Sequence, residues 1–203
     1  MALSSALTAG LVGLVAQRLA HDRMAPWVLG RAGGVLAYLL LVALVSSGLL
    51  LSHPARFRYR IGPAQRIRLH ALLAALTASF TVLHVIALSI DRYAGVGWWG
   101  ALVPAGSSYR PVPVSLGVLG LWSGAAAGLT AAGAGRLPRR IWWPLHKLAA
   151  VSLVLCWLHA TLAGSDASAL RWYYIGSALP VIALAMSRYA AAGPAERVRG
   201  RLS

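Results

Sequence analysis

The chain has 203 residues, of which 59% are hydrophobic and only 11% are charged, and its mean hydropathy is +0.68. Soluble globular domains carry about 25% charged residues, so this composition predicts an integral membrane protein surrounded by a lipid bilayer. It argues against a soluble enzyme, a disordered tail and a nucleic-acid-binding module, because a basic groove does not require so apolar a chain. The single cysteine, Cys156, excludes a disulfide within the chain.

Apolar stretches of membrane-spanning length divide the chain. A bilayer core about 30 Å thick requires roughly 20 residues of helix. Five stretches of about that length, each bounded by charge or proline, cover residues 33–52, 70–90, 113–132, 146–163 and 173–190. A sixth stretch, 3–17, is shorter and lacks the basic segment that begins a signal peptide, so we predict a first, weaker span there. A cleaved or surface-lying N-terminal helix is the alternative. The prediction is an all-α bundle of six transmembrane helices that forms a single domain over residues 1–203.

The net charge of +15 indicates the orientation of these spans. Lys and Arg in short loops are retained on the cytoplasmic side. One set of loops and ends contains thirteen cations against the single acid Glu196: Arg56, Arg58, Arg60, Arg66, Arg68, Arg136, Arg139, Arg140, Lys147, Arg188, Arg197, Arg199 and Arg201. The other set contains six cations and three acids: Arg18, Arg23, Arg31, Arg92, Arg110 and Arg171, with Asp22, Asp91 and Asp166. The first set is therefore predicted to be cytoplasmic, together with both termini.

Smaller patterns indicate packing and interface positions. Gly120, Gly124 and Gly128 recur every four residues on one face of the span 113–132, where small residues allow helices to approach closely. Aromatic side chains at span ends are predicted to lie at the membrane interface: Trp98, Trp99, Trp142, Trp143 and Trp172. The loop from Asp91 to Pro113 is predicted to have irregular backbone, because it is rich in Gly, Pro and Ser.

Four of the six histidines lie inside predicted spans, where ionisable groups are costly and usually functional. His70 and His84 are 14 residues apart in one span, and His146 and His159 are 13 residues apart in another. At 1.5 Å per residue these spacings are about 21 and 20 Å. Both spans are predicted to run outward. His70 is therefore expected level with His146 near the inner face, and His84 level with His159 nearer the outer face.

Two facing neutral imidazoles are what a low-spin haem iron accepts as axial ligands. We therefore predict one haem at each level, with the two histidines of that level as its iron ligands. Together the two haems would form an electron path across the membrane. The alternative is that each histidine hydrogen-bonds a nearby carbonyl or hydroxyl group. Hydroxyl groups close to the histidines in the sequence are those of Thr77, Thr81 and Ser152.

Two further points concern these histidines. An ion bound by side chains alone is disfavoured, because ligands about 20 Å apart cannot share it; Cys156, one turn before His159, is assigned to packing. On an ideal helix His84 lies within about 40° of His70, whereas His159 lies about 140° from His146. Pro144 is predicted to place His146 in the first turn of its helix, where unwinding, or else a bulge further along, would correct the angle.

Each haem also carries two propionate carboxylates, which require cationic or hydrogen-bonding partners at the membrane face. The candidates are Arg68, Arg140 and Lys147 for the inner haem, and Arg31 and Arg110 for the outer haem. The alternative for each of them is a cation that reaches the interface or binds lipid headgroups.

Several segments together resemble a known family. They are VLGRAGGVLAYLLLVALVSSGLLLS, RLHALLAALTASFTVLH, VPAGSSYRPV and RRIWWPLHKLAAVSLVLCWLH followed by AGSD. With the histidine spacings, they make the chain from Trp27 onward similar to the ferric reductase-like transmembrane domain of ferric reductases and NADPH oxidases. The resemblance implies that His70 with His146 bind an inner b-type haem, and that His84 with His159 bind an outer one.

The chain also departs from that family. Ferric reductases and NADPH oxidases usually append a cytoplasmic flavin and nicotinamide-nucleotide domain, and no such domain is expected in this chain. The glycine-containing segment 133–137 lies between spans with no strand before it, so it is not a dinucleotide fingerprint. We therefore expect a separate cytoplasmic flavoprotein reductase, a membrane quinol or a small reductant as electron donor. A bound FAD or FMN would be compatible with this, but no motif supports one.

The expected function is electron transfer in the cell membrane, from a cytoplasmic or membrane donor to an acceptor on the outer side, in a haem-dependent oxidoreductase or its membrane subunit. One alternative is the haem-binding membrane subunit of a periplasmic methionine sulfoxide reductase system, whose pattern lacks a histidine matching His70. An alternative of another class is a haem-free transporter or membrane assembly factor. Transporters usually contain intramembrane acids and inverted repeats, and neither pattern occurs in this sequence.

Overall fold

The computed structural model describes residues 23–54, 61–164 and 167–199, the last eight of these by their backbone alone. Within these ranges every regular element is a helix and no strand occurs. The helices are α2 (Ala25–Leu51), α3 (Pro63–Ile90), α4 (Gly97–Leu102), α5 (Pro111–Ala132), α6 (Arg139–His146), α7 (Leu148–Ala163) and α8 (Arg171–Arg199). The all-α prediction is confirmed for this part of the chain. The predicted span 3–17 lies outside the described residues.

Four helical segments are long and apolar enough to cross a bilayer: α2, α3, α5, and α6 with α7 taken together. Large apolar side chains remain exposed on them, including Leu129 (74%) and Ile67 (62%). Water would disfavour such exposure, whereas lipid would not. The architecture is thus consistent with a multi-pass membrane protein. Helix α8, which contains the predicted span 173–190, is not one of the four.

Helices α2 and α3 begin before the apolar stretches that predicted them. The sequence placed their starts at residues 33 and 70, whereas the helices begin at Ala25 and Pro63. Proline occupies the first turn of each helix, where its missing N–H group is not needed. Charged residues such as Arg31 lie inside these helices, because backbone hydrogen bonds continue regardless of side-chain polarity. The loop between α3 and α5 also differs from the prediction, since it contains the short helix α4.

The predicted span 146–163 is divided in the structure. His146 is the last residue of α6, and α7 begins only at Leu148. The prediction that His146 lies in the first turn of its spanning helix is therefore wrong. Pro144 lies inside α6, where it removes one backbone donor and crowds the carbonyl four residues before it. Helix α6 ends two residues after this proline, and α7 begins after the single intervening residue Lys147.

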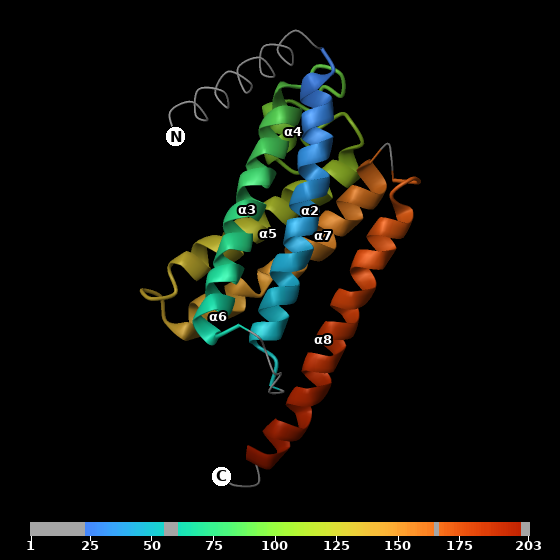
Figure 1. Cartoon of the computed structure of the whole chain (residues 1–203). Helices are drawn as coiled ribbons and strands as arrows, with labels where there is room; N and C mark the ends of the chain where they lie inside the picture. Colours follow the sequence, from blue (N-terminus) through green and yellow to red (C-terminus); the bar gives the residue numbers. More distant parts are fainter. Residues whose placement is uncertain (1–22, 55–60, 165–166, 200–203) are drawn as a thin grey trace, which may run out of the picture.

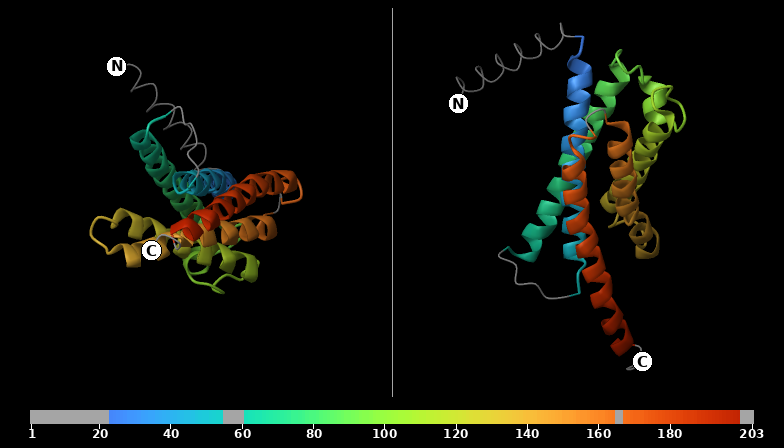
Figure 2. Two further views of the ribbon diagram at one scale, coloured as in Figure 1. Left: turned by 90° about the horizontal axis from the view of Figure 1, so that it is seen from below. Right: turned by 90° about the vertical axis from the view of Figure 1, so that its right-hand side faces the viewer.

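Two helix pairs form the body of the protein: α2 packs on α3, and α5 packs on α7 (Figure 1). Helix α2 also contacts α7, and α8 lies along α2 (Figure 2). The buried core lies where α2, α7 and α8 meet, and it consists of Tyr38, Leu41, Val45, Leu153 and Tyr174. Helices α3 and α7 are not a closely packed pair. Two histidines of α3 there face one histidine of α6 and one of α7.

Glycines allow α5 and α7 to approach closely. A Cβ atom added to Gly120 would lie 2.8 Å from Sγ of Cys156, and one added to Gly124 would lie 2.9 Å from Oγ of Ser152. The Ser152 hydroxyl donates to the Gly120 carbonyl at 2.8 Å, which joins the two backbones. Gly128 has nothing within 4 Å of its Cβ position. The predicted packing role is therefore confirmed for Gly120 and Gly124 but not for Gly128.

This difference gives a stability test with a matched control. We expect Gly120→Val to lower the free energy of unfolding by about 1–3 kcal/mol through overpacking. Gly128→Val introduces the same side chain on the same helix without a contact, so its effect should be much smaller. Thermal unfolding of both variants in detergent measures the difference. Equal destabilisation by the two substitutions would contradict the assigned helix contact.

Candidate functional site

The structure brings the four intramembrane histidines together in two pairs. The ring centres of His70 and His146 are 6.2 Å apart, with 71° between the ring planes. Those of His84 and His159 are also 6.2 Å apart, with an angle of 74°. The pairs predicted from spacing are therefore the pairs that the fold forms. The angle calculated for one ideal helix does not apply, because His146 ends α6 and His159 lies in α7.

The outer pair is held by backbone carbonyls of neighbouring helices. Nδ1 of His84, on α3, lies 2.6 Å from the carbonyl oxygen of Gly30 on α2. Nδ1 of His159, on α7, lies 2.8 Å from the carbonyl oxygen of Pro113 on α5. Since a carbonyl only accepts, the imidazole proton is on Nδ1 in both rings. Each helix pair thus fixes one ring of the outer pair.

The inner pair is held in a related way, with one different acceptor. Nδ1 of His146 lies 3.3 Å from the carbonyl oxygen of Ala127, which is a long hydrogen bond. Nδ1 of His70 lies 2.8 Å from the hydroxyl oxygen of Ser47 on α2. The Ser47 hydroxyl itself donates to the carbonyl of Leu44 at 2.7 Å. Its oxygen is then an acceptor for His70, which also carries its proton on Nδ1.

All four rings therefore keep their second nitrogen available. In the described residues, no hydrogen bond involves Nε2 of these four histidines. With the proton on Nδ1, Nε2 carries a lone pair. Histidines that bind metals nearly always donate their other N–H group to a carbonyl, a carboxylate or water. The hydroxyl groups that the sequence offered as alternative partners, on Thr77, Thr81 and Ser152, bond to backbone carbonyls instead.

Glycines give the rings their places against the neighbouring helices. A Cβ atom on Gly34 would lie 2.7 Å from Nδ1 of His84, and one on Gly117 would lie 2.8 Å from Nδ1 of His159. A Cβ atom on Gly48 would lie 3.3 Å from Cε1 of His70. These glycines and Ser47 were not among the site residues predicted from the sequence. The available signal was a glycine within each span that faces a histidine-bearing span.

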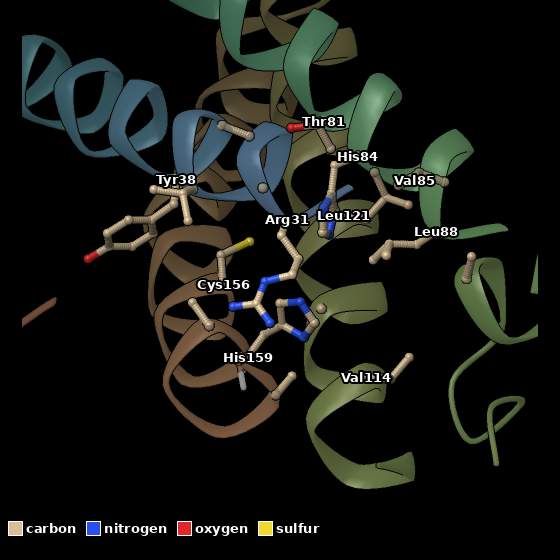
Figure 3. A pocket seen from close by; sticks show the side chains of 18 of the residues that line it. Arg31, Tyr38, Thr81, His84, Val85, Leu88, Val114, Leu121, Cys156 and His159 are labelled. Atoms are coloured by element: carbon tan, nitrogen blue, oxygen red, sulfur yellow. The ribbon is translucent and has the colours of Figure 1, made fainter. Parts of the chain in front are cut away.

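The outer histidines line a large, mostly apolar cavity, drawn in Figure 3. It contains about 1330 Å³ of empty space, part of which is the open space at its mouth. His84 points into it from α3 and His159 from α7. Apolar side chains such as Val85, Val114 and Leu121 form much of the wall. A flat, apolar ligand between two imidazoles fits these surroundings.

The distances within the pairs agree with binding of one metal ion by each pair. Two imidazoles that bind a metal from opposite sides at about 2.0 Å place their ring centres about 6 Å apart. Both pairs have 6.2 Å. Among the described residues there is no cluster of three or more His, Cys, Asp or Glu side chains for a bare metal ion. Haem requires only two protein ligands, because its macrocycle occupies the other coordination positions, so the donor set fits haem better than a free ion.

The two cations assigned to the outer site differ in position. Arg31 lines the cavity beside the outer pair (Figure 3), and its guanidinium lies 5.3 Å from the ring centre of Trp27. It is placed where a carboxylate of a bound ligand could reach it. Arg110 does not line the cavity; its Nη1 donates to the carbonyls of Leu162 and Ala163 at 2.9 and 3.3 Å. Arg110 therefore caps the end of α7.

The cations assigned to the inner site are all exposed. Arg68 precedes His70 on α3, and Arg140 lies in the first turn of α6. Lys147 lies between α6 and α7, with its Nζ 5.7 Å from the ring centre of Trp143. Trp143 stacks on His146 at 6.2 Å and 29°, and Trp142 lies 6.0 Å from the same ring. The two tryptophans, predicted only as interface residues, thus also flank an inner histidine.

Comparison with known proteins adds no relative. No family model, no curated protein and no solved structure matches the chain. The resemblance to the ferric reductase-like domain therefore stays a prediction from the sequence. The geometry of the histidine pairs is an independent observation.

The hydrogen-bond pattern predicts the tautomer of each paired histidine. We expect His84 and His159 to be neutral with the proton on Nδ1 in haem-free protein, because each faces a carbonyl oxygen at short distance. Nitrogen-15 NMR of histidine-labelled protein distinguishes the two tautomers, and His84→Gln and His159→Gln variants assign the signals. Signals of the Nε2–H tautomer from these two residues would contradict the assignment.

Proposed function

We propose that this chain is a transmembrane electron-transfer protein of the ferric reductase-like type, which binds two b-type haems through His70 with His146 and His84 with His159. The observation that carries the proposal is a geometry that occurs twice. At each level two imidazoles lie 6.2 Å apart, each fixed through Nδ1 and open at Nε2. A purely structural hydrogen bond would explain one half-buried histidine of this kind, but not two matched pairs.

In this proposal the protein holds and orients the haems, and each bound haem supplies the redox chemistry. A bis-histidine haem provides a centre that accepts and releases single electrons. The helix pairs hold the four rings in place, so that little rearrangement accompanies a change of charge. The apolar wall around His84 and His159 limits the access of water. Arg31 supplies a positive charge on that wall for a propionate group.

The two levels support a path across the membrane. His70 and His84 are about 21 Å apart along α3. Because both pairs are complete, the structure favours two haems over a single outer one. Each haem would take both of its protein ligands from one histidine pair, which would disfavour oxygen binding at the iron. We therefore propose that the acceptor is reduced at the haem edge on the outer side.

The donor is proposed to act at the opposite face. Exposed cations lie near the inner pair, on α3, α6 and the α6–α7 junction: Arg68, Arg139, Arg140 and Lys147. Such a surface would suit an acidic cytoplasmic flavoprotein, and a membrane quinol is the alternative donor. Retention of cations on the cytoplasmic side explains the same charges without any partner. The charge distribution is the observation that supports the proposed donor.

The haem assignment has a direct spectroscopic test. We expect purified protein to show a low-spin b-type spectrum after reduction and about two haems per chain. His84→Leu removes one outer ligand and should lower this ratio to about one. His53→Leu is the matched control, because His53 lies outside both pairs and its Nε2 contacts Ser187 at 3.4 Å. Protein without haem would exclude the proposed function, and two haems in the His84→Leu variant would show that the ligands are misassigned.

We further propose six spans with both termini in the cytoplasm of the cell, since the loop charges support this arrangement. Phosphatase inserted after Gly106, in the loop before α5, should be active outside the cell membrane. A fluorescent protein fused after Ser203 should fold inside and fluoresce. The reverse pattern would require the opposite orientation and would exchange the inner and outer labels of the histidine pairs.

A further inference from the structure

Each paired histidine is held by one acceptor of its Nδ1–H group, which we call its anchor. One of the four anchors differs from the other three. His84, His146 and His159 donate to backbone carbonyls, whereas His70 donates to a side-chain hydroxyl. That hydroxyl belongs to Ser47 in the last third of α2. Ser47 is therefore the one anchor among these four that a side-chain substitution removes without disturbing the backbone.

The hydroxyl of Ser47 is fixed in the orientation that accepts. Its proton goes to the carbonyl of Leu44 at 2.7 Å, one turn earlier in α2. This bond leaves the lone pairs of Oγ for Nδ1 of His70 at 2.8 Å. A hydroxyl that already donates is also a better acceptor, because hydrogen bonds in a chain polarise one another. The His70–Ser47–Leu44 chain thus ties the ring on α3 to the backbone of α2.

The inner pair depends on this bond more than the outer pair depends on any single anchor. The anchor of the other inner ring, between His146 and Ala127, is 3.3 Å long. The two outer anchors are 2.6 and 2.8 Å long. Hydrogen bonds weaken as the distance increases beyond about 3.0 Å. Ser47 therefore provides the stronger of the two constraints on the inner rings.

The next residue supports the same ring from its side. Gly48 leaves room for His70, since a Cβ atom there would lie 3.3 Å from Cε1 of the imidazole. Ser47 and Gly48 thus form one contact surface of α2, one residue bonding the ring and the other making space for it. This arrangement resembles the outer sites, where Gly30 and Gly34 on α2 have these two roles for His84.

We propose that Ser47 is a positioning residue of the inner haem site, which fixes the Nδ1–H tautomer and the ring direction of His70 and raises the electron density that Nε2 offers to iron. This inference rests on the proposed haem function. An acceptor on Nδ1–H makes the imidazole a more basic ligand, and a more basic ligand favours ferric over ferrous iron. Loss of the acceptor should therefore raise the reduction potential of the inner haem and leave that of the outer haem unchanged.

The experiment compares Ser47→Ala, Ser47→Thr and Ser46→Ala in purified, haem-loaded protein. Ser46→Ala is the matched control, because it removes the neighbouring hydroxyl, which forms no bond to a paired histidine. Redox titration of the visible bands resolves the two midpoint potentials, and electron paramagnetic resonance of the oxidised protein reports the angle between axial ligand planes. The same substitutions in the His84→Leu background, with only the inner haem expected, identify which centre changes.

We expect Ser47→Ala to shift the inner midpoint potential upward, or to lose the inner haem alone, and to change the inner resonance signal. Ser47→Thr should restore both values, because it keeps the hydroxyl, and Ser46→Ala should leave them unchanged. Retention of the outer haem in each variant shows that the bundle has folded.

The failures of the two proposals are distinguishable. Wild-type protein without haem would refute the proposed function. Two haems in wild-type protein, with unchanged potentials and signals in Ser47→Ala, would refute only the role of Ser47. Loss of both haems in Ser47→Ala, or an equal effect of Ser46→Ala, would also overturn it, because either result indicates general disruption of α2.

Discussion

The organisation of this bundle depends on how a half-buried imidazole satisfies its two nitrogens. A neutral ring has one donor and one acceptor, and an apolar helix pair offers few free partners, because its carbonyls already serve the helices. Here each ring donates from Nδ1 to an oxygen of the adjacent helix. That one bond fixes the tautomer, restricts the ring direction and leaves Nε2 without a hydrogen bond to any described residue. Gly34, Gly48 and Gly117 lie where a Cβ atom would crowd rings that are held in this way.

The two rings of the outer site are held by the same local arrangement of a backbone carbonyl and a glycine. On α2 the carbonyl of Gly30 accepts from His84, and four residues later Gly34 makes room for the ring. On α5 the carbonyl of Pro113 accepts from His159, and four residues later Gly117 has the corresponding role. A spacing of four residues places both groups on one helix face. Each helix pair therefore contributes one ring already oriented, and the cavity forms where the two pairs face one another.

Much of this could be predicted from the sequence, because hydropathy and histidine spacing are strong signals. They gave the helical class, the long apolar helices and the ring pairs. They did not give the anchors, since a glycine beside a ring and a glycine beside open space have the same local pattern. A Cβ atom on Gly117 would lie 2.8 Å from Nδ1 of His159, whereas one on Gly128, on the same helix, would have nothing within 4 Å. They also placed helix starts too late, because apolarity follows the membrane and not the backbone. Arg110 was assigned from its place in a loop on the predicted outer side, but its guanidinium bonds to the end of α7.

The break between α6 and α7 shows why spacing alone was ambiguous at one point. Thirteen residues on one ideal helix would turn His159 about 140° from His146, yet both rings reach partners on the same helix, α3. His146 is the last residue of the short helix α6, which contains Pro144, whereas His159 lies in α7. The inner ring thereby takes its direction from Ala127, Trp142 and Trp143, and the outer ring takes its direction from α7. Because the two levels are oriented independently, a change at the inner pair can leave the outer pair in place.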